Sequence, residues 1–281
     1  MGRASPVDCV IVLGSGLMAP GIARARASTG ARVVIAARNY DRAAAVARSA
    51  GVAAVPLDQQ SLRDGDLVIE TITEDREAKR DLYEKIEGWF KPTAILASNT
   101  SSLALAELAE RLSHPEQFIG FHFLNPAELT PIAEIVPASL TSEETIERVT
   151  DFARRMGKRP LVLRHDVRGF IWNRIQFAVL RECLYLLERG VADADVIDAA
   201  VADGLAPRWM GAGPLATAQL GGLETFRRVA AELFPDLAKE TTPPARLGRE
   251  LYSWDEARRD ELVEFRREAI DLGAQLARRR P

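Results

Sequence analysis

The stretch CVIVLGSGLMAPGIA, residues 9–23, contains the strongest indication of fold in this chain. Its first five residues form a short apolar run rich in β-branched side chains, which is typical of a buried strand. A GxGxxA pattern follows at once and opens a helix, so a pyrophosphate could approach the turn at the helix N-terminus. A plain glycine turn is the alternative interpretation. The predicted dinucleotide contacts are Gly14, Ser15, Gly16, Leu17 and Met18.

Five further apolar runs alternate with helical segments in the first half of the chain. They are RVVIAA (32–37), DLVIET (66–71), TAILAS (93–98), FIGFHF (118–123) and RPLVLR (159–164). This alternation is typical of a parallel sheet covered by crossover helices. Before the last run, a capping-box pattern from Thr141 to Glu144 predicts a helix that ends at Gly157.

Beyond this half the sequence becomes helical almost throughout, with helical patterns over 171–190, 192–205 and 223–234 and a charged helix at the end. The prediction is therefore an α/β protein with two domains. Residues 1–166 form a Rossmann-type, doubly wound dinucleotide-binding domain. Residues 167–281 form an all-α domain that shapes the substrate site and makes a homodimer.

Composition narrows the class of partner. The formal net charge is −3, from 37 basic and 40 acidic residues, which provides no field that would attract nucleic acid or an acidic membrane. Cys9 and Cys183 do not form a disulfide framework, and we expect no metal site. The chain has neither a membrane-length apolar run nor, at MGRASP, a secretory signal pattern, so we expect a cytoplasmic protein with a small-molecule partner.

The end of the second predicted strand bears on the choice of cofactor. An NAD site usually places an acidic side chain there, against the ribose 2′-hydroxyl. This chain has Ala37 and Arg38 instead, and a guanidinium can bind a 2′-phosphate. We therefore expect a preference for NADP(H), with NAD(H) not excluded. The alternative is that Arg38 is an ordinary surface arginine.

Three spaced motifs complete the pattern: SNTSSL (98–103), GFHFLNP (120–126) and GFIWNR (169–174). With the glycine turn, they resemble the 3-hydroxyacyl-CoA dehydrogenase family. The resemblance implies hydride transfer between NAD(P)(H) and a 3-hydroxy or 3-keto acyl thioester or a small hydroxy acid. Later segments, RIQFAVLREC (174–183) and DGLAPRW (203–209), look more like the branch with L-gulonate 3-dehydrogenase, carnitine dehydrogenase and polyketide ketoreductases.

A histidine is the natural acid and base for such a reaction, because its ordinary pKa lies near neutrality. Of the three histidines, His114 lies in a polar loop and His165 at the predicted domain boundary, whereas His122 ends an apolar run. By the resemblance, His122 is the acid–base residue and Glu134 its carboxylate partner. The apolar segment 132–136 supports this pairing, because a buried carboxylate is costly unless it is paired.

The resemblance also assigns polar groups around the reacting atoms. Ser101 and Asn173 match groups near the substrate oxygen, although Ser101 could instead cap a helix or form a turn. Residues that would contact the cofactor are Glu74, Lys79, Asn99 and Asn125. Glu74 and Lys79 could equally be an exposed helical pair, because such charges mostly face solvent.

Two departures from the family affect the choice of substrate. Members that act on CoA thioesters commonly insert a basic helical hairpin, but the interval 38–65 is short and lacks lysine. GRELYSW (248–254) keeps only part of the C-terminal glycine and tyrosine signature. An acyl-carrier thioester, a polyketide intermediate or an NAD-linked oxidation of a free hydroxy acid, of the L-gulonate or carnitine type, therefore stays open beside acyl-CoA. A non-catalytic, crystallin-like dinucleotide-binding protein is the rival from another class.

Overall fold

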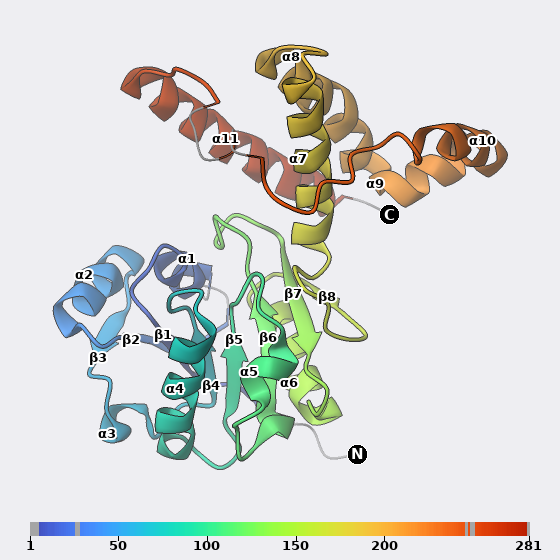
Figure 1. Cartoon of the computed structure of the whole chain (residues 1–281). Helices are drawn as coiled ribbons and strands as arrows, with labels where there is room; N and C mark the ends of the chain where they lie inside the picture. Colours follow the sequence, from blue (N-terminus) through green and yellow to red (C-terminus); the bar gives the residue numbers. More distant parts are fainter. Residues whose placement is uncertain (1–5, 26–28, 245–246, 248–250, 280–281) are drawn as a thin grey trace. The chain divides into compact units, whose positions relative to one another are not determined.

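A computed structural model describes residues 6–25, 29–244, 247 and 251–279. Residues 1–5 of MGRASP and 248–250 of GRELYSW lie outside this set. The chain divides into a first unit that ends at Ile171 and a second unit that begins at Trp172 (Figure 1). The sequence placed the boundary a little earlier, between residues 166 and 167. The difference arises because the segment up to Ile171 packs with the first unit, as Phe170 is fully buried there.

The first unit is built on one eight-stranded sheet with the order β3-β2-β1-β4-β5-β6-β7-β8. The strands are β1 (Cys9–Leu13), β2 (Arg32–Ala36), β3 (Ala53–Val55), β4 (Leu67–Glu70), β5 (Ile95–Ser98), β6 (Phe118–His122), β7 (Ile132–Pro137) and β8 (Arg159–Val162). Neighbouring strands are parallel except for β6 and β7. The strand order changes direction between β1 and β4, which defines a doubly wound sheet. The predicted α/β class is therefore confirmed.

Helices cover both faces of this sheet (Figure 1). They are α1 (Met18–Arg24), α2 (Tyr40–Ala50), α3 (Gln59–Leu62), α4 (Arg76–Ile86), α5 (Leu105–Ala109) and α6 (Glu143–Arg155). Alternate residues of a strand point to opposite faces. Val10 and Val12 of β1 accordingly pack in the core under α1, α2 and α6, whereas Ile11 and Leu13 pack in the core under α4 and α5.

The start of α6 corrects one prediction. The capping-box assignment of Thr141 is wrong, because the hydroxyl of Ser142 caps the helix by accepting from the Thr145 N–H. Thr141 Oγ1 instead donates to the Phe118 carbonyl at 2.6 Å and accepts from the Ala138 N–H at 2.8 Å. The helix does end as predicted, since α6 stops at Arg155 and Gly157, with a φ of +71°, follows the C-cap residue Met156.

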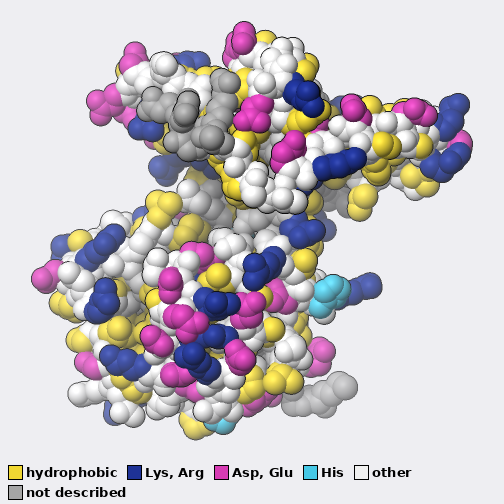
Figure 2. Space-filling view, in the orientation of Figure 1, with side chains coloured by type: hydrophobic (Ala, Val, Ile, Leu, Met, Phe, Trp, Pro, Cys, Tyr) yellow, Lys and Arg dark blue, Asp and Glu magenta, His cyan; other side chains and the backbone are white. Residues whose placement is uncertain are grey.

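The second unit is helical, as predicted. It contains α7 (Trp172–Glu188), α8 (Ala194–Ala199), a π-helical segment (Ala200–Leu205), α9 (Ala206–Gly221), α10 (Leu223–Leu233) and α11 (Glu256–Ala277). Gly213 has a φ of +68° and kinks α9 before Pro214. Large apolar side chains of α10, such as Val229 and Leu233, remain exposed, and Figure 2 shows hydrophobic side chains along this helix.

None of the helices within the described residues has the length and apolar character that a membrane crossing requires. The two cysteines, Cys9 and Cys183, are free thiols. The expected cytoplasmic location and the expected lack of nucleic-acid and membrane partners stay predictions.

Candidate active site

The glycine turn after β1 has the shape that a dinucleotide site needs. Gly14 has a φ of +130°, and its N–H donates to the Ala36 carbonyl at 2.8 Å. A Cβ at Gly14 would come within 2.5 Å of Thr71 Oγ1, so no other residue fits there. A Cβ at Gly16 would meet nothing closer than the Thr71 carbonyl oxygen at 3.9 Å. The turn therefore leaves its backbone open to a phosphate on the side of Gly16.

The end of β2 carries Ala37 and the exposed Arg38. Arg38 makes no hydrogen bond or ion pair with any residue that the structure describes. Asn39 Oδ1 accepts from the Arg42 N–H at 2.9 Å and caps α2. The guanidinium at this position is thus available to a ligand, whereas the neighbouring amide is engaged by the protein.

A buried acidic side chain, Glu70, organises the carboxyl ends of β4 and β5. Its Oε1 accepts from Lys79 Nζ at 2.6 Å, and its Oε2 accepts from the Tyr83 hydroxyl at 2.6 Å and the Ser98 hydroxyl at 2.9 Å. Glu70 and Lys79 are 0% and 1% exposed. Burial, and then the nearby Glu70 charge, raise the pKa of the Tyr83 phenol well above its ordinary value.

This cluster excludes the exposed helical pair that the sequence left open, because Lys79 is fully buried and Glu74 precedes α4. Sequence reasoning did not single out Glu70. The signal was available, since Glu70 is a carboxylate at the end of the apolar run LVIE, just as Glu134 lies within an apolar run. The same cost of burying an unpaired charge applies to both residues.

Glu74 holds the turn that carries Ser101. Its Oε1 accepts from the Thr100 hydroxyl at 2.7 Å, the Ser101 N–H at 2.8 Å and the Ser102 N–H at 2.9 Å. Burial acts to raise the pKa of Glu74, but these hydrogen bonds and the Lys79 charge outweigh it and hold the pKa below the ordinary value. The carboxylate is therefore charged near neutrality and fixes this turn.

His122 and Glu134 form a buried pair across the antiparallel strands β6 and β7. The register places the two residues directly opposite each other. His122 Nδ1 lies 2.7 Å from Glu134 Oε2, and the other carboxylate oxygen accepts from the Ile171 N–H at 2.9 Å. The carboxylate can only accept, so Nδ1 carries the proton and Nε2 is left as the basic nitrogen. Nε2 lies 3.4 Å from Ser101 Oγ.

The structure thus brings Ser101, His122 and Glu134 together. Ser101 does not cap the next helix, because the N-cap of α5 is Ala104.

The three asparagines that the resemblance assigned lie in different places. Asn99 is buried, and its Oδ1 accepts from the Phe123 N–H at 2.8 Å. Asn125 lies exposed beyond β6, and Asn173 lies in the first turn of α7, in the second unit.

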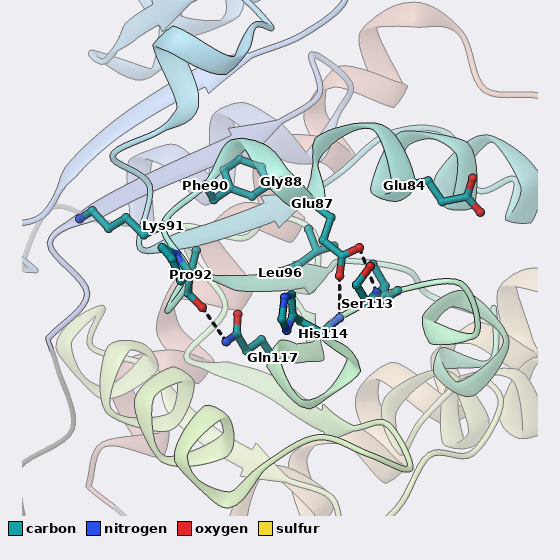
Figure 3. Close-up of a pocket in the computed structure, with 12 residues that line it drawn as sticks. Glu84, Glu87, Gly88, Phe90, Lys91, Pro92, Leu96, Ser113, His114 and Gln117 are labelled. Atoms are coloured by element: carbon teal, nitrogen blue, oxygen red, sulfur yellow. Dashed lines mark hydrogen bonds between the residues drawn. The ribbon is translucent and has the colours of Figure 1, made fainter.

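A surface pocket of about 400 Å³ lies elsewhere, near the amino ends of β5 and β6 (Figure 3). Its polar groups bond to one another: Glu87 accepts from the Ser113 and His114 N–H groups, and Gln117 Nε2 donates to the Pro92 carbonyl. Ligands of doubly wound sheets bind at the carboxyl ends of the strands, where His122 lies. This pocket is therefore not the candidate active site.

No cluster of His, Cys, Asp and Glu within the described residues could hold a metal ion.

A glycine turn on a doubly wound sheet, with an imidazole–carboxylate pair at the carboxyl ends of its strands, defines the class of nicotinamide-dependent oxidoreductases. The model of the 3-hydroxyacyl-CoA dehydrogenase NAD-binding domain matches residues 41–167. The model of the C-terminal domain of the same family matches residues 169–268. The chain belongs to the 3-hydroxyacyl-CoA dehydrogenase family, as its motifs predicted.

Known relatives act on different substrates. A 5-formyl-3-hydroxy-2-methylpyridine 4-carboxylate 5-dehydrogenase of Mesorhizobium japonicum is 32% identical over 249 residues, which are 82% of this chain and 81% of that protein. A 3-hydroxybutyryl-CoA dehydrogenase of Bradyrhizobium diazoefficiens is 35% identical over 87% of this chain and 89% of that protein.

Among solved structures, a 5-formyl-3-hydroxy-2-methylpyridine 4-carboxylic acid 5-dehydrogenase, described as an NAD⁺-dependent dismutase, has a TM-score of 0.89. It is 26% identical and covers 98% of this chain and 100% of its own. An Archaeoglobus fulgidus 3-hydroxyacyl-CoA dehydrogenase has a TM-score of 0.73 over 95% of this chain and 99% of its own, at 27% identity.

Proposed function

We propose that this oxidoreductase interconverts a secondary alcohol and a ketone on a small hydroxy-acid or acyl substrate, with His122 as the acid and base. The observation that carries the proposal is the 2.7 Å contact of His122 Nδ1 with Glu134, which leaves Nε2 beside Ser101. In oxidation Nε2 accepts the hydroxyl proton, and in reduction it returns that proton. Glu134 keeps the imidazole in this tautomer and stabilises its protonated form.

Ser101 and Asn173 are proposed to donate hydrogen bonds to the substrate oxygen. Such donors stabilise the negative charge that develops on the oxygen as the hydride moves. The half-buried Ser101 lies within hydrogen-bond range of the imidazole, which supports its role. For Asn173 the support is its place in the GFIWNR motif.

The residues at the glycine turn fit a dinucleotide. Gly14, Ser15, Gly16, Leu17 and Met18 would hold the pyrophosphate. A bound nicotinamide would supply the hydride donor or acceptor. Glu74, Lys79, Asn99 and Asn125 are proposed to contact the ribose, phosphate or nicotinamide of the cofactor. The contacts of Glu74 and Lys79 also support an indirect role in shaping the site. Glu74 holds the 100–102 turn, and Lys79 Nζ lies 3.6 Å from Glu74 Oε2.

We infer that NADP(H) is the preferred cofactor. The end of β2 has Ala37 and a partner-free Arg38 where a 2′-hydroxyl would require a carboxylate. A guanidinium suits a 2′-phosphate. The NAD⁺ dependence of the solved relative described above is the competing precedent. NADP(H) use favours reduction of a keto group as the working direction.

A substrate without a CoA carrier is favoured. The interval 38–65 contains only α2, β3 and α3, with no inserted hairpin to grip CoA phosphates. One relative named above is a dehydrogenase of a pyridine carboxylate. A free hydroxy acid is therefore our first choice, and acyl-CoA, an acyl-carrier thioester and a polyketide intermediate are the competing substrates.

One kinetic panel tests these proposals together. A 3-hydroxy acid and its CoA thioester are each assayed with NAD⁺ and NADP⁺, and the matching 3-keto compounds with the reduced cofactors. We expect a higher kcat/KM with the NADP couple and with the free acid. Equal or better efficiency with NAD would refute the inference from Arg38. A clear preference for the thioester would refute the inference from the short interval.

The second unit supports a homodimer. Its buried apolar residues within the described part are Leu184, Ile197, Ala238 and Ala274, whereas α9, α10 and α11 expose many large apolar side chains. Large apolar side chains exposed together on neighbouring helices are typical of a protein interface. We expect light scattering to give twice the chain mass of 30.9 kDa at micromolar concentration. A concentration-independent monomer would contradict this.

A further inference from the structure

The short turn at the end of the first unit has an unusual backbone. Phe170 has a φ of +49°, the one positive φ among the non-glycine residues that the structure describes. Its side chain is fully buried, and its N–H donates to the Val167 carbonyl at 2.9 Å. A bulky residue in the left-handed region is strained and persists only where its surroundings hold it. Such strain is found mostly at functional sites.

This turn contacts both members of the imidazole–carboxylate pair. The ring of Phe170 lies edge-on to the imidazole of His122, with 5.4 Å between the ring centroids and 63° between the planes. The next residue, Ile171, donates its backbone N–H to Glu134 Oε1 at 2.9 Å. Because adjacent residues make these two contacts, the backbone bend at Phe170 sets both at once.

The start of the turn is anchored near the serine. Asp166 Oδ2 accepts from the Leu105 N–H at 2.7 Å, and Leu105 closely follows the turn that carries Ser101. The segment from Asp166 to Ile171 therefore contacts His122 and Glu134, and it is anchored on the residue that begins α5.

We propose that Phe170 is a positioning residue for the acid–base pair. Its ring prevents the imidazole of His122 from rotating about the Cβ–Cγ bond, and its left-handed backbone aims the Ile171 N–H at Glu134. With one carboxylate oxygen held by that N–H, the other stays directed at Nδ1. The proposal rests on the proposed roles of His122 and Glu134.

The test replaces Phe170 with leucine, which keeps an apolar side chain but removes the aromatic edge. Phe152→Leu on α6 is the matched control, because Phe152 is equally buried but packs in the core on the α1, α2 and α6 side of the sheet. Denaturant unfolding reports the fraction folded for both variants. If Phe170→Leu does not fold, Phe170→Met serves in its place.

We expect Phe170→Leu to lower kcat about 10-fold to 100-fold per folded enzyme, because a misplacement of about 1 Å can cost about 10²-fold. The Kd for the dinucleotide should stay unchanged. Phe152→Leu should lose stability without this loss of kcat. An unchanged kcat in folded Phe170→Leu together with an unchanged imidazole signal, or an equal loss of kcat in Phe152→Leu, overturns the proposal.

NMR of the imidazole protons gives a readout that does not depend on turnover, since the chain has only three histidines. The hydrogen-bonded Nδ1–H of His122 should give a downfield signal that shifts and broadens in Phe170→Leu but not in Phe152→Leu. An unchanged signal overturns the positioning role. A changed signal with unchanged turnover keeps the positioning role and counts against the catalytic role proposed for His122.

Discussion

Replacing His122 with alanine is expected to lower kcat by about 10² to 10⁴-fold, the usual contribution of a general acid or base. The reason is that Nε2 is the basic nitrogen of the pair, because Glu134 engages Nδ1 at 2.7 Å. Without it, water must exchange the proton of the substrate hydroxyl. The Kd for the dinucleotide should change little, because the glycine turn does not involve His122. Steady-state kinetics and a cofactor titration measure the two quantities.

His114→Ala is the matched control for this variant. The side chain of His114 is 60% exposed, and its ring lies beside the Glu116 carboxylate. His114 precedes β6, at the amino ends of the strands, whereas His122 lies at their carboxyl ends. We expect full activity from it. Unchanged turnover in His122→Ala would remove the proposed role and leave the crystallin-like, non-catalytic protein as the better explanation. Loss of dinucleotide binding in His122→Ala would show a structural effect instead.

Replacing Lys79 with methionine is expected to lower the free energy of unfolding by about 3–5 kcal/mol, the typical cost of leaving one member of a buried ion pair without its partner. Glu70 is 0% exposed, and its contact with Lys79 Nζ is 2.6 Å. The Tyr83 and Ser98 hydroxyls would remain, but neither carries a compensating charge. Denaturant unfolding followed by circular dichroism measures the change.

Lys85→Met on the same helix is the control, because Lys85 is exposed. Surface substitutions of this kind usually change stability by less than about 0.5 kcal/mol. The double variant Glu70→Gln with Lys79→Met should recover part of the loss, since it removes the orphaned charge. A loss in Lys79→Met no larger than in Lys85→Met would contradict the account of this cluster.

The proposed catalytic and cofactor residues differ in how far the sequence could place them. The family resemblance of the GFHFLNP motif implied the pair of His122 and Glu134, and the apolar segment around Glu134 supported it. The distance between them depends on the antiparallel register of β6 and β7, which sets His122 opposite Glu134. For Glu74 and Lys79, the pattern left exposed and buried interpretations equally open, and the packing of α4 on the sheet excluded the exposed pair.

Local patterns were sufficient for the α/β class, for most strands and for the glycine turn. Apolar runs and glycine turns depend on residues that are close in the sequence, so the sequence alone predicts the strands, helices and turns that they form. Their limits appear at β3, whose three residues are too short to show a period, and at Ser142, where two adjacent hydroxyls could each begin the helix.

The folded chain was needed for contacts between distant residues. The Glu70 cluster joins β4, α4 and β5, and the contacts of Phe170 and Ile171 join a turn to β6 and β7. Such contacts arise when strand register and helix packing bury polar groups that must then find partners. Periodicity identifies which faces become buried, but it does not state which charges meet there.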